Sequence, residues 1–318
     1  MTNPGDANPA PDPMAGRPSV SVIIPHLNTP DALRRCLISV TGQQLASGHA
    51  EIIVVDNGSA VSPAPVIAEF PGISLLLEPT PGPGPARNRG VAAASAATLA
   101  FIDADCRAAP GWLQAAVTAV AADPLHAIVG GDIRIDFVDP ATLTGIEAYE
   151  AVFGFRQHQY IAKKHFSVTA NLAMAAAVHA RVGGFAGIDR AEDLDWGQRA
   201  HAAGLTTRYD PRMLVLHPAR PKFSALASKW QRHIRHDWNA HHAKGSSDWR
   251  WHLRAAALVA SIPVESLKLL TSNRISGLAN RLRGIAILAR IRCYRAAEMR
   301  RVMASPAATG AMTWNRQP

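Results

Sequence analysis

The sequence predicts an α/β fold in which a mostly parallel, Rossmann-like sheet is flanked by helices. Three observations favour this fold class. Short apolar runs alternate with helix-forming segments through the first half of the chain. These runs are continuously hydrophobic, which is typical of strands buried on both faces of a parallel sheet. Acidic residues follow several of them, and the carboxyl ends of the strands are where open α/β sheets bind ligands.

The first strand, helix and second strand carry strong local signals. Residues 19–24 (SVSVII) are rich in β-branched side chains and precede Pro25, which we expect to end the strand. Residues 31–40 carry apolar side chains at helical spacing after a Thr-Pro-Asp start signal. Residues 51–55 (EIIVV) form the next strand. Asp56 follows it, where the carboxylate could accept a hydrogen bond from a base or ribose, or cap the turn.

A Gly/Pro-rich segment at residues 79–90 (PTPGPGPARNRG) follows a third strand at 73–77. We expect it to be a loop that leads into an Ala-rich helix at residues 91–97. Such a loop can offer backbone N–H groups, together with Arg87 and Arg89, to a phosphate. It is not a dinucleotide fingerprint, because Arg87 stands where the third glycine should be. A Rossmann oxidoreductase is therefore not favoured.

Asp103 and Asp105 follow the apolar run at residues 99–102, which predicts a buried strand. Two carboxylates one residue apart at a strand end suit a hard divalent cation such as Mg²⁺ or Mn²⁺, which usually completes its shell with substrate phosphates and water. The alternative is an ordinary acid-rich turn.

The second half of the predicted sheet adds a group of acids and a histidine. We expect a helix at 110–121 and extended segments at 127–131 and 133–137. We also expect strands at 168–174 and 213–216, the first of them followed by a short helix that ends at Gly183. Glu192, Asp193 and Asp195 begin another helix that ends near Gly204. We expect Glu192 and Asp195 to share one helix face and Asp193 to lie on another, so that structural and catalytic roles could divide between them. His217 follows the last strand and is either a packed residue or a ligand.

These pieces, in this order, resemble the family-two glycosyltransferases, whose A-type fold binds a nucleotide-diphosphate sugar. The resemblance covers about residues 19–220, our expected catalytic domain, and rests on the motifs SVIIPHLN, VVDNGS, GPARNRG, FIDADC, TANLAM, GGF, EDLDWGQR and VLHPA. Two positions depart from the family pattern. Leu27 replaces the usual aromatic residue before Asn28, and residues 197–199 only loosely match the element that follows the acidic motif. These departures bear on base selectivity and on processive polymerisation.

The resemblance implies a role for each candidate residue and an inverting, metal-dependent transfer without a covalent intermediate. Asp193 is the implied general base. Asp105, Asp103 and His217 are the implied ligands of Mn²⁺ or Mg²⁺. The implied nucleotide-sugar contacts are Pro25, Asn28, Asp56, Arg87, Asn88, Asp103, Asn171 and Glu192. The implied acceptor is a lipid-linked glycan or a precursor of a cell-envelope polysaccharide.

Composition adds expectations about location and partners. The 318 residues carry a formal net charge of +9, which favours an anionic partner. Three widely spaced cysteines form no recognisable disulfide framework, so a reduced cytoplasmic location is expected. Residues 1–18 are rich in Pro, Gly and Asp and predict a disordered tail without a signal pattern. No apolar run is long enough to predict a membrane-spanning helix.

Residues 221–318 form the expected basic helical extension. Residues 229–254 combine tryptophans with Lys, Arg and five histidines, which could serve a nucleic-acid surface or an anionic lipid interface, with metal binding less favoured. An apolar stripe between residues 278 and 302, beside several arginines, favours peripheral attachment to an anionic membrane. The alternative is a helix that packs on the catalytic domain. The alternative function is a non-catalytic nucleotide- or nucleic-acid-binding protein.

Overall fold

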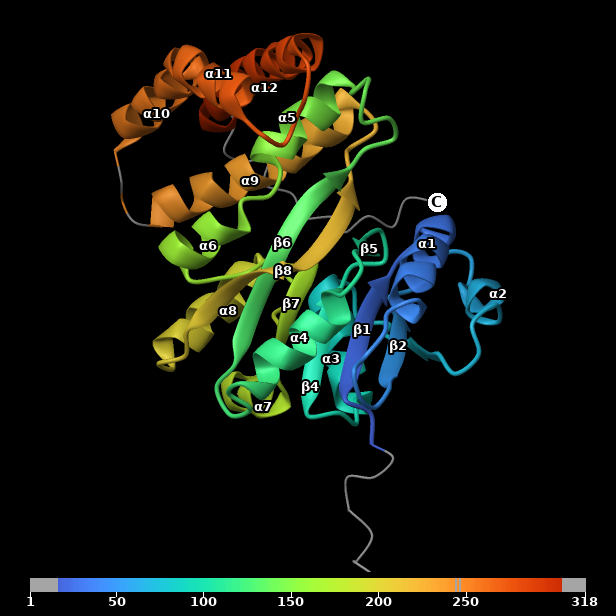
Figure 1. Cartoon of the computed structure of the whole chain (residues 1–318). Helices are drawn as coiled ribbons and strands as arrows, with labels where there is room; N and C mark the ends of the chain where they lie inside the picture. Colours follow the sequence, from blue (N-terminus) through green and yellow to red (C-terminus); the bar gives the residue numbers. More distant parts are fainter. Residues whose placement is uncertain (1–16, 244, 246, 305–318) are drawn as a thin grey trace, which may run out of the picture.

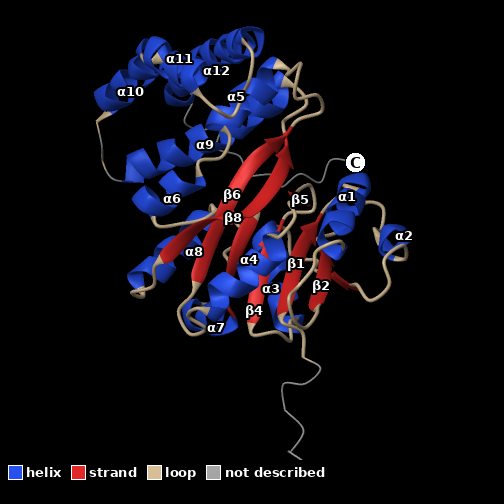
Figure 2. Cartoon of the chain, viewed as in Figure 1, coloured by secondary structure: helices blue, strands red, loops and turns tan. Residues whose placement is uncertain are grey.

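The structure is a computed structural model that describes residues 17–243, 245 and 247–304. Residues 1–16 of the expected N-terminal tail lie outside this range, and so does the side chain of His236 among the five C-terminal histidines. One eight-stranded sheet, in the order β3-β2-β1-β4-β7-β6-β8-β5, runs through the molecule with helices against it (Figures 1 and 2). The expected α/β fold class is confirmed.

Most neighbouring strands of the sheet are parallel. β2 pairs with β1 and β3, β1 pairs with β4, and β6 pairs with β8, all in parallel. β7 is antiparallel to both of its neighbours, β4 and β6, and the short β5 is antiparallel to β8. The strands are β1 (Val20–His26), β2 (Ala50–Asp56), β3 (Ser74–Leu77), β4 (Thr98–Ile102), β5 (Arg107–Ala108), β6 (Ile128–Asp136), β7 (Asn171–Ala175) and β8 (Thr207–Pro218).

The helices cover the sheet and then build a helical unit beyond the end of β6 (Figure 1). Before residue 220 they are α1 (Pro30–Thr41), α2 (Ala64–Ile67), α3 (Pro83–Ala93), α4 (Trp112–Ala121), α5 (Gly145–Phe153), α6 (Gln157–Lys164), α7 (Ala176–Val182) and α8 (Glu192–Ala202). The C-terminal helices are α9 (Phe223–Ala243), α10 (Asp248–Ala260), α11 (Ile262–Thr271) and α12 (Leu278–Ala304).

Pro25 does not end the first strand, contrary to the sequence-based expectation. β1 continues to His26, and Pro25 is in register with Val55 of β2. On the other side of β1, the pairing with β4 stops where Ile23 meets Phe101. A proline is tolerated here because the backbone beyond Ile23 has no β4 partner that needs an N–H donor.

The Gly/Pro-rich segment is also different from the expected loop, since α3 begins inside it and ends at Ala93. Pro83 and Pro85 lie in the first turn, where a backbone N–H has no intrahelical partner to lose. Gly84 and Gly90 let the helix lie close to its neighbours. A Cβ on Gly84 would come within 2.0 Å of the Ala186 carbonyl oxygen, and one on Gly90 within 2.5 Å of Ile23. Helix α3 therefore lies tightly against the sheet.

Two further strands differ from their expected bounds. Residues 168–170 form a turn, closed by a hydrogen bond from the Asn171 N–H to the Val168 carbonyl, so β7 starts only at Asn171. β8 starts at Thr207 and includes His217, because most of its length pairs with β6. His217 is thus held by strand pairing, close to the carboxyl end of β8.

The apolar stripe of α12 is divided between the protein core and the surface. Leu288 and Ile291 are buried, together with Tyr149 of α5 and Leu269 of α11, in a core that the C-terminal helices share with the preceding part of the chain. Leu278 and Leu282 remain 65% and 53% exposed. Most of α12 therefore packs on the protein, as in the alternative stated above. Among the described residues, no helix is both long and apolar enough to cross a membrane.

Candidate active site at the carboxyl ends of the strands

The candidate residues gather at one edge of the sheet because β1, β2, β4 and β8 all run in the same direction. At this edge Asp56 is buried at the end of β2, with 7% of its surface exposed. One carboxylate oxygen accepts hydrogen bonds from the Ser59 hydroxyl (2.5 Å) and the Ser59 N–H (3.3 Å). The same oxygen lies 3.3 Å from Nδ1 of His26. These contacts fix the orientation of the Asp56 carboxylate.

His26 was not among the candidates predicted from sequence. Its Nε2 accepts a hydrogen bond from the Thr29 N–H at 3.2 Å, so the proton of the neutral ring lies on Nδ1, which can donate to Asp56. Burial lowers the pKa of His26, against the opposing effect of Asp56, and favours this neutral form. The signal was its position directly after Pro25 at a strand end. A lone histidine there is too common to single out.

Asn28 joins the two loops that follow β1 and β2. Its backbone has a φ of 54°, a left-handed conformation that asparagine tolerates better than most residues. Its side-chain oxygen accepts from the Ala60 N–H at 2.8 Å, and its own N–H donates to the Ser59 hydroxyl at 2.9 Å. Asn28 is exposed beside Pro25 and therefore forms part of the accessible rim of the site.

Arg87 occupies the centre of the site, on α3. It is 3% exposed and donates to Asp103 at 2.7 Å and to Glu192 at 3.2 Å. Burial opposes its charge, but Asp103, Asp193 and Glu192 outweigh burial and raise the pKa of Arg87. Its Nε is buried and has no hydrogen-bond partner among the described residues. The guanidinium thus links β4 to α8.

Asp193 is held by Thr169, whose hydroxyl and backbone N–H donate to the same carboxylate oxygen at 2.6 Å and 3.2 Å. Burial, followed by the nearby charge of Glu192, raises the pKa of Asp193 to about 7, against the opposing effects of Arg87 and Thr169. A carboxylate with a pKa near neutrality can accept a proton from a substrate hydroxyl. Its surroundings are thus compatible with proton exchange near neutral pH.

We expected Glu192 and Asp195 to share one face of α8 and Asp193 to lie on another. In the structure Glu192 instead acts together with Asp193. Glu192 and Asp193 both act on Arg87, whereas Asp195 pairs with Arg190 and Arg199 at 2.8 Å and 2.9 Å. Glu192 is the first residue of α8, so its side chain can reach Arg87 from the end of the helix instead of following a helix face. Asp195 therefore has the structural role.

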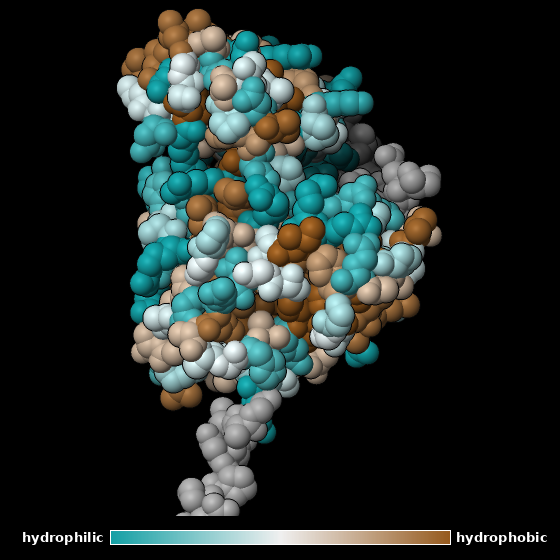
Figure 3. Space-filling model, turned by 45° about the vertical axis from the view of Figure 1, so that its right-hand side comes forward, coloured by the Kyte–Doolittle hydropathy of each residue, from teal (hydrophilic) through white to brown (hydrophobic). Residues whose placement is uncertain are grey.

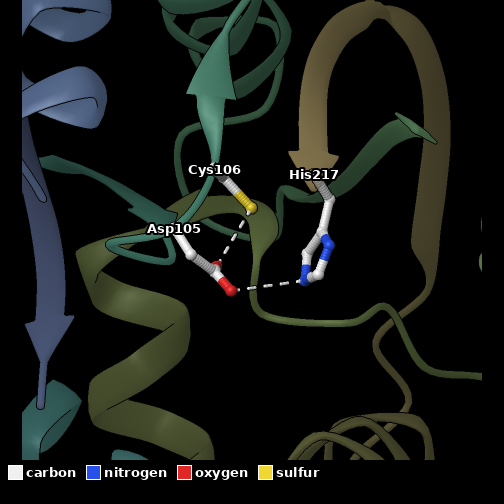
Figure 4. A group of neighbouring side chains, drawn as sticks. All are labelled: Asp105, Cys106 and His217. Atoms are coloured by element: carbon white, nitrogen blue, oxygen red, sulfur yellow. Dashed lines mark hydrogen bonds and ion pairs between the residues drawn. The ribbon is translucent and has the colours of Figure 1, made fainter. Parts of the chain in front are cut away.

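Asp105, Cys106 and His217 form a second cluster, beside β5 and β8 (Figure 4). One oxygen of Asp105 lies 3.7 Å from Nε2 of His217, and the other lies 3.8 Å from the Cys106 sulfur. Cys106 was not predicted, although it follows Asp105 directly. Burial raises the pKa of its thiol well above the ordinary value, which favours the protonated thiol. Asp103 lies outside this cluster and pairs with Arg87.

The ring orientation of His217 favours cation binding. Its Nδ1 lies 2.7 Å from the Pro218 carbonyl oxygen, which can only accept, so Nδ1 carries a proton. In the neutral ring the lone pair of Nε2 is then on the side of Asp105. An imidazole nitrogen and a carboxylate oxygen that face each other in this way could hold a cation between them. A carboxylate oxygen and an imidazole nitrogen suit Mn²⁺, and the oxygen also suits Mg²⁺.

Two residues predicted to contact the nucleotide sugar, Asn88 and Asn171, instead form hydrogen bonds within the protein. The side chain of Asn88 exchanges two hydrogen bonds with the backbone of Phe185, at 2.8 Å and 2.9 Å. Asn171 has no exposed surface. Its amide accepts from the Trp112 indole and donates to two backbone carbonyls, so no part of it is free for a ligand. Both residues shape the site from behind.

The fold and these side chains define a class of protein, an A-type glycosyltransferase. The family model described as Glycosyl transferase family 2 matches residues 21–192. Glycosyltransferase AglE of Haloferax volcanii is 32% identical over 218 residues, which cover 67% of this chain and 70% of that protein. Pre-mycofactocin glycosyltransferase of Mycobacterium tuberculosis is 30% identical over 222 residues, 67% of this chain and 46% of that protein.

A solved structure agrees in fold. The mannosyltransferase PcManGT of Pyrobaculum calidifontis, in complex with GDP-Man and Mn²⁺, superposes with a TM-score of 0.52 and 17% identity, over 93% of this chain and 77% of that one. The chain therefore belongs to glycosyltransferase family 2. It is a glycosyltransferase that uses nucleotide-sugar donors.

Proposed function

We propose that this chain transfers a sugar from a nucleotide-diphosphate sugar, with inversion at the anomeric carbon, to a hydroxyl group of a lipid-linked glycan or cell-envelope polysaccharide precursor. The observation that carries the proposal is Asp193. Its pKa is raised to about 7, Thr169 fixes one of its oxygens, and it lies beside the ion-paired Arg87. Asp193 would thus be a base close to Arg87, Asp103 and Glu192, the side chains that would meet the diphosphate.

The donor would bind across the loops after β1, β2 and β4. Asp56, Pro25 and Asn28 would receive the base and its ribose, because an oriented carboxylate and an exposed amide are available there. Arg87, Asp103 and Glu192 would meet the ribose and the sugar diphosphate. Asn88 would contribute through the Phe185 backbone that it holds, and Asn171 would contribute to the stability of the sheet beneath the site.

A divalent cation, Mn²⁺ or Mg²⁺, would be held by Asp105 and His217, with Asp103 as an additional ligand if it exchanges Arg87 for the metal. The metal would neutralise charge on the departing diphosphate. The relative PcManGT, whose structure contains Mn²⁺, favours manganese. The half-exposed side chain of Asp105, at 39%, leaves room for the phosphates.

Asp193 would remove the proton from the acceptor hydroxyl as its oxygen attacks the anomeric carbon. The bond between that carbon and the phosphate oxygen breaks on the opposite side, and its electron pair leaves with the nucleoside diphosphate. Arg87 would stabilise the negative charge that develops on that diphosphate. A single in-line displacement inverts the anomeric configuration and needs no covalent intermediate.

The C-terminal helices support a peripheral location on an anionic, cytoplasmic membrane face. Leu253 of α10, Val264 and Leu267 of α11, and Leu282 of α12 are each more than half exposed. Hydrophobic residues gather at the top of the space-filling view, over this helical unit (Figure 3). Together with the net charge of +9, they suit a surface of anionic lipid. Trp238 and Trp251 are buried, at 4% and 1%, which removes two aromatics from any nucleic-acid surface.

A donor screen tests this function. The purified chain is incubated with a panel of nucleotide sugars, a polyprenyl-linked acceptor and Mn²⁺. Turnover of one donor is expected, with loss of at least about tenfold on chelation of the metal. Proton NMR of the product should show the anomeric configuration opposite to that of the donor. Retention of configuration, or full turnover in the presence of chelator, would contradict the proposal.

A further inference from the structure

A cationic cavity lies apart from the candidate active site, between α5, the start of α6 and the end of α11. Its volume is about 210 Å³, and its ionisable lining residues are Arg156, His158, Lys268 and Arg274. All four are basic, and no acid lines the cavity. Phe155, which also lines it, packs its ring on His217 with 4.7 Å between centroids. Phe155 therefore separates this cavity from the proposed metal ligand.

The charges in this cavity are only partly compensated. Lys268 pairs with Glu265 at 2.7 Å, and Arg274 pairs with Asp132 at 3.2 Å, but no acid pairs with Arg156 among the described residues. The Nε of Arg156 is buried and lacks a hydrogen-bond partner. Arg156 as a whole is only partly buried, so its guanidinium can meet a ligand in the cavity. Phosphate suits the forked geometry of such an unpaired guanidinium.

The backbone adds donors at the same place. Arg156 is the N-cap residue of α6, and no side chain caps this helix terminus. The first-turn residues His158 and Gln159 line the cavity together with Arg156. The Gln159 N–H already donates to the Arg156 carbonyl at 2.9 Å, so the helix N-terminus favours a negative charge through its dipole and the N–H groups that precede Gln159. Side chain and backbone thus favour the same ligand.

We propose that this cavity binds a phosphate ester. It lies beside the exposed apolar residues Val264 and Leu267 of α11, the helix that carries Lys268, so a membrane lipid could place its headgroup in the cavity. A soluble phosphate ester offers the same chemistry. The site does not depend on the proposed transfer reaction, and binding can be measured without turnover.

Arg156→Gln and Lys268→Gln test the proposal, with Lys163→Gln as the matched control. Lys163 lies at the other end of α6, is exposed and does not line the cavity. Binding is measured in two arms: to phosphatidylcholine vesicles that contain phosphatidic acid, by flotation, and to glycerol 3-phosphate, by calorimetry. Thermal melting checks that each variant is folded.

The two cavity variants should weaken binding about tenfold in at least one arm, because each removes a charge-assisted hydrogen bond, and the control should change it by less than about twofold. A loss with vesicles identifies a lipid headgroup, and a loss with glycerol 3-phosphate alone identifies a soluble ester. Wild-type affinity of the cavity variants in both arms would overturn the proposal. An equal loss in Lys163→Gln, or no binding by the wild type in either arm, would also overturn it.

Discussion

Asp193 shows how its surroundings can change the pKa of a single carboxylate. Burial and Glu192 raise its pKa to about 7, whereas Asp195, two residues along the same helix, has its pKa lowered, since its arginine partners outweigh burial. The two residues are of the same type, but their pKa values are shifted in opposite directions. Only Asp193 is therefore suited to exchange a proton near neutral pH.

The transfer rate should rise with pH through about pH 7 and then level off, because Asp193 must be deprotonated to act as a base. A pH–rate profile of kcat/KM at saturating metal checks this. The matched Asp195→Asn variant should keep the same profile. A rate that is flat between about pH 5 and 8 would contradict the assignment.

The raised pKa of Asp193 should make the protein less stable as pH rises, whereas it makes the transfer rate increase. Between the ordinary pKa of 3.8 and about 7, the folded state holds a proton on Asp193 that the unfolded state has lost. The contribution of this carboxyl to stability therefore falls as pH rises through that window. Without donor, Asp193→Asn should melt about 2 °C or more above the wild type at pH 8 and converge with it near pH 4. A lower melting temperature at pH 8 would argue against a raised pKa.

At this scale, sequence predicted residue types better than contacts. Asp56, Asp103 and Asp105 are recognisable because acids follow apolar strands. The pairing of Arg87 with Glu192 was not, since the two residues are 105 positions apart and meet only through the fold. His26 was missed because its role depends on a tautomer that Thr29 selects.

Asn171 matters at the scale of elements, because it ties the antiparallel β7 to its surroundings. Its amide joins the Trp112 indole of α4 to the Asp132 and Met213 carbonyls, in β6 and β8. A Cβ on Gly131 would lie 2.2 Å from the same amide, so glycine is needed for β6 to pass it. The amide thus replaces hydrogen bonds that the irregular part of the sheet lacks.

Asn171→Ala should lower the free energy of unfolding by about 3 kcal/mol or more, because it leaves three buried polar groups unpaired. Nucleotide affinity per folded molecule should change little. Urea unfolding and calorimetry check the two effects, with the exposed Asn273→Ala as control. Unchanged stability together with lost nucleotide affinity would instead make Asn171 a donor contact.

Element types were largely predictable, and their bounds were not. The apolar runs rich in Ile and Val form strands, as predicted. The end of β1 depended on whether Pro25 met a hydrogen-bonding partner in the sheet. The start of α3 depended on its prolines falling in the first helical turn, where no N–H is needed. Residues 168–170 read as strand because they are apolar or β-branched, but a turn there brings Thr169 to Asp193.

On the scale of the whole molecule, the basic C-terminal helices after β8 pack on the earlier part of the chain and leave some apolar side chains exposed. α12 packs on α5 and shares its core, so the C-terminal helices are fixed relative to the sheet. Composition predicted their basic character. It could not show which apolar residues remain exposed, because an apolar stripe is equally suited to a membrane and to a neighbouring helix.

The most direct test of the central claim compares Asp193→Asn with Asp105→Asn in Mn²⁺, measuring both transfer and nucleotide-sugar binding. Asp195→Asn is the matched control. The account predicts that Asp193→Asn loses transfer by about 100-fold or more and keeps metal-dependent binding, whereas Asp105→Asn loses both. Wild-type transfer by Asp193→Asn, or normal metal-dependent binding by Asp105→Asn, would contradict it.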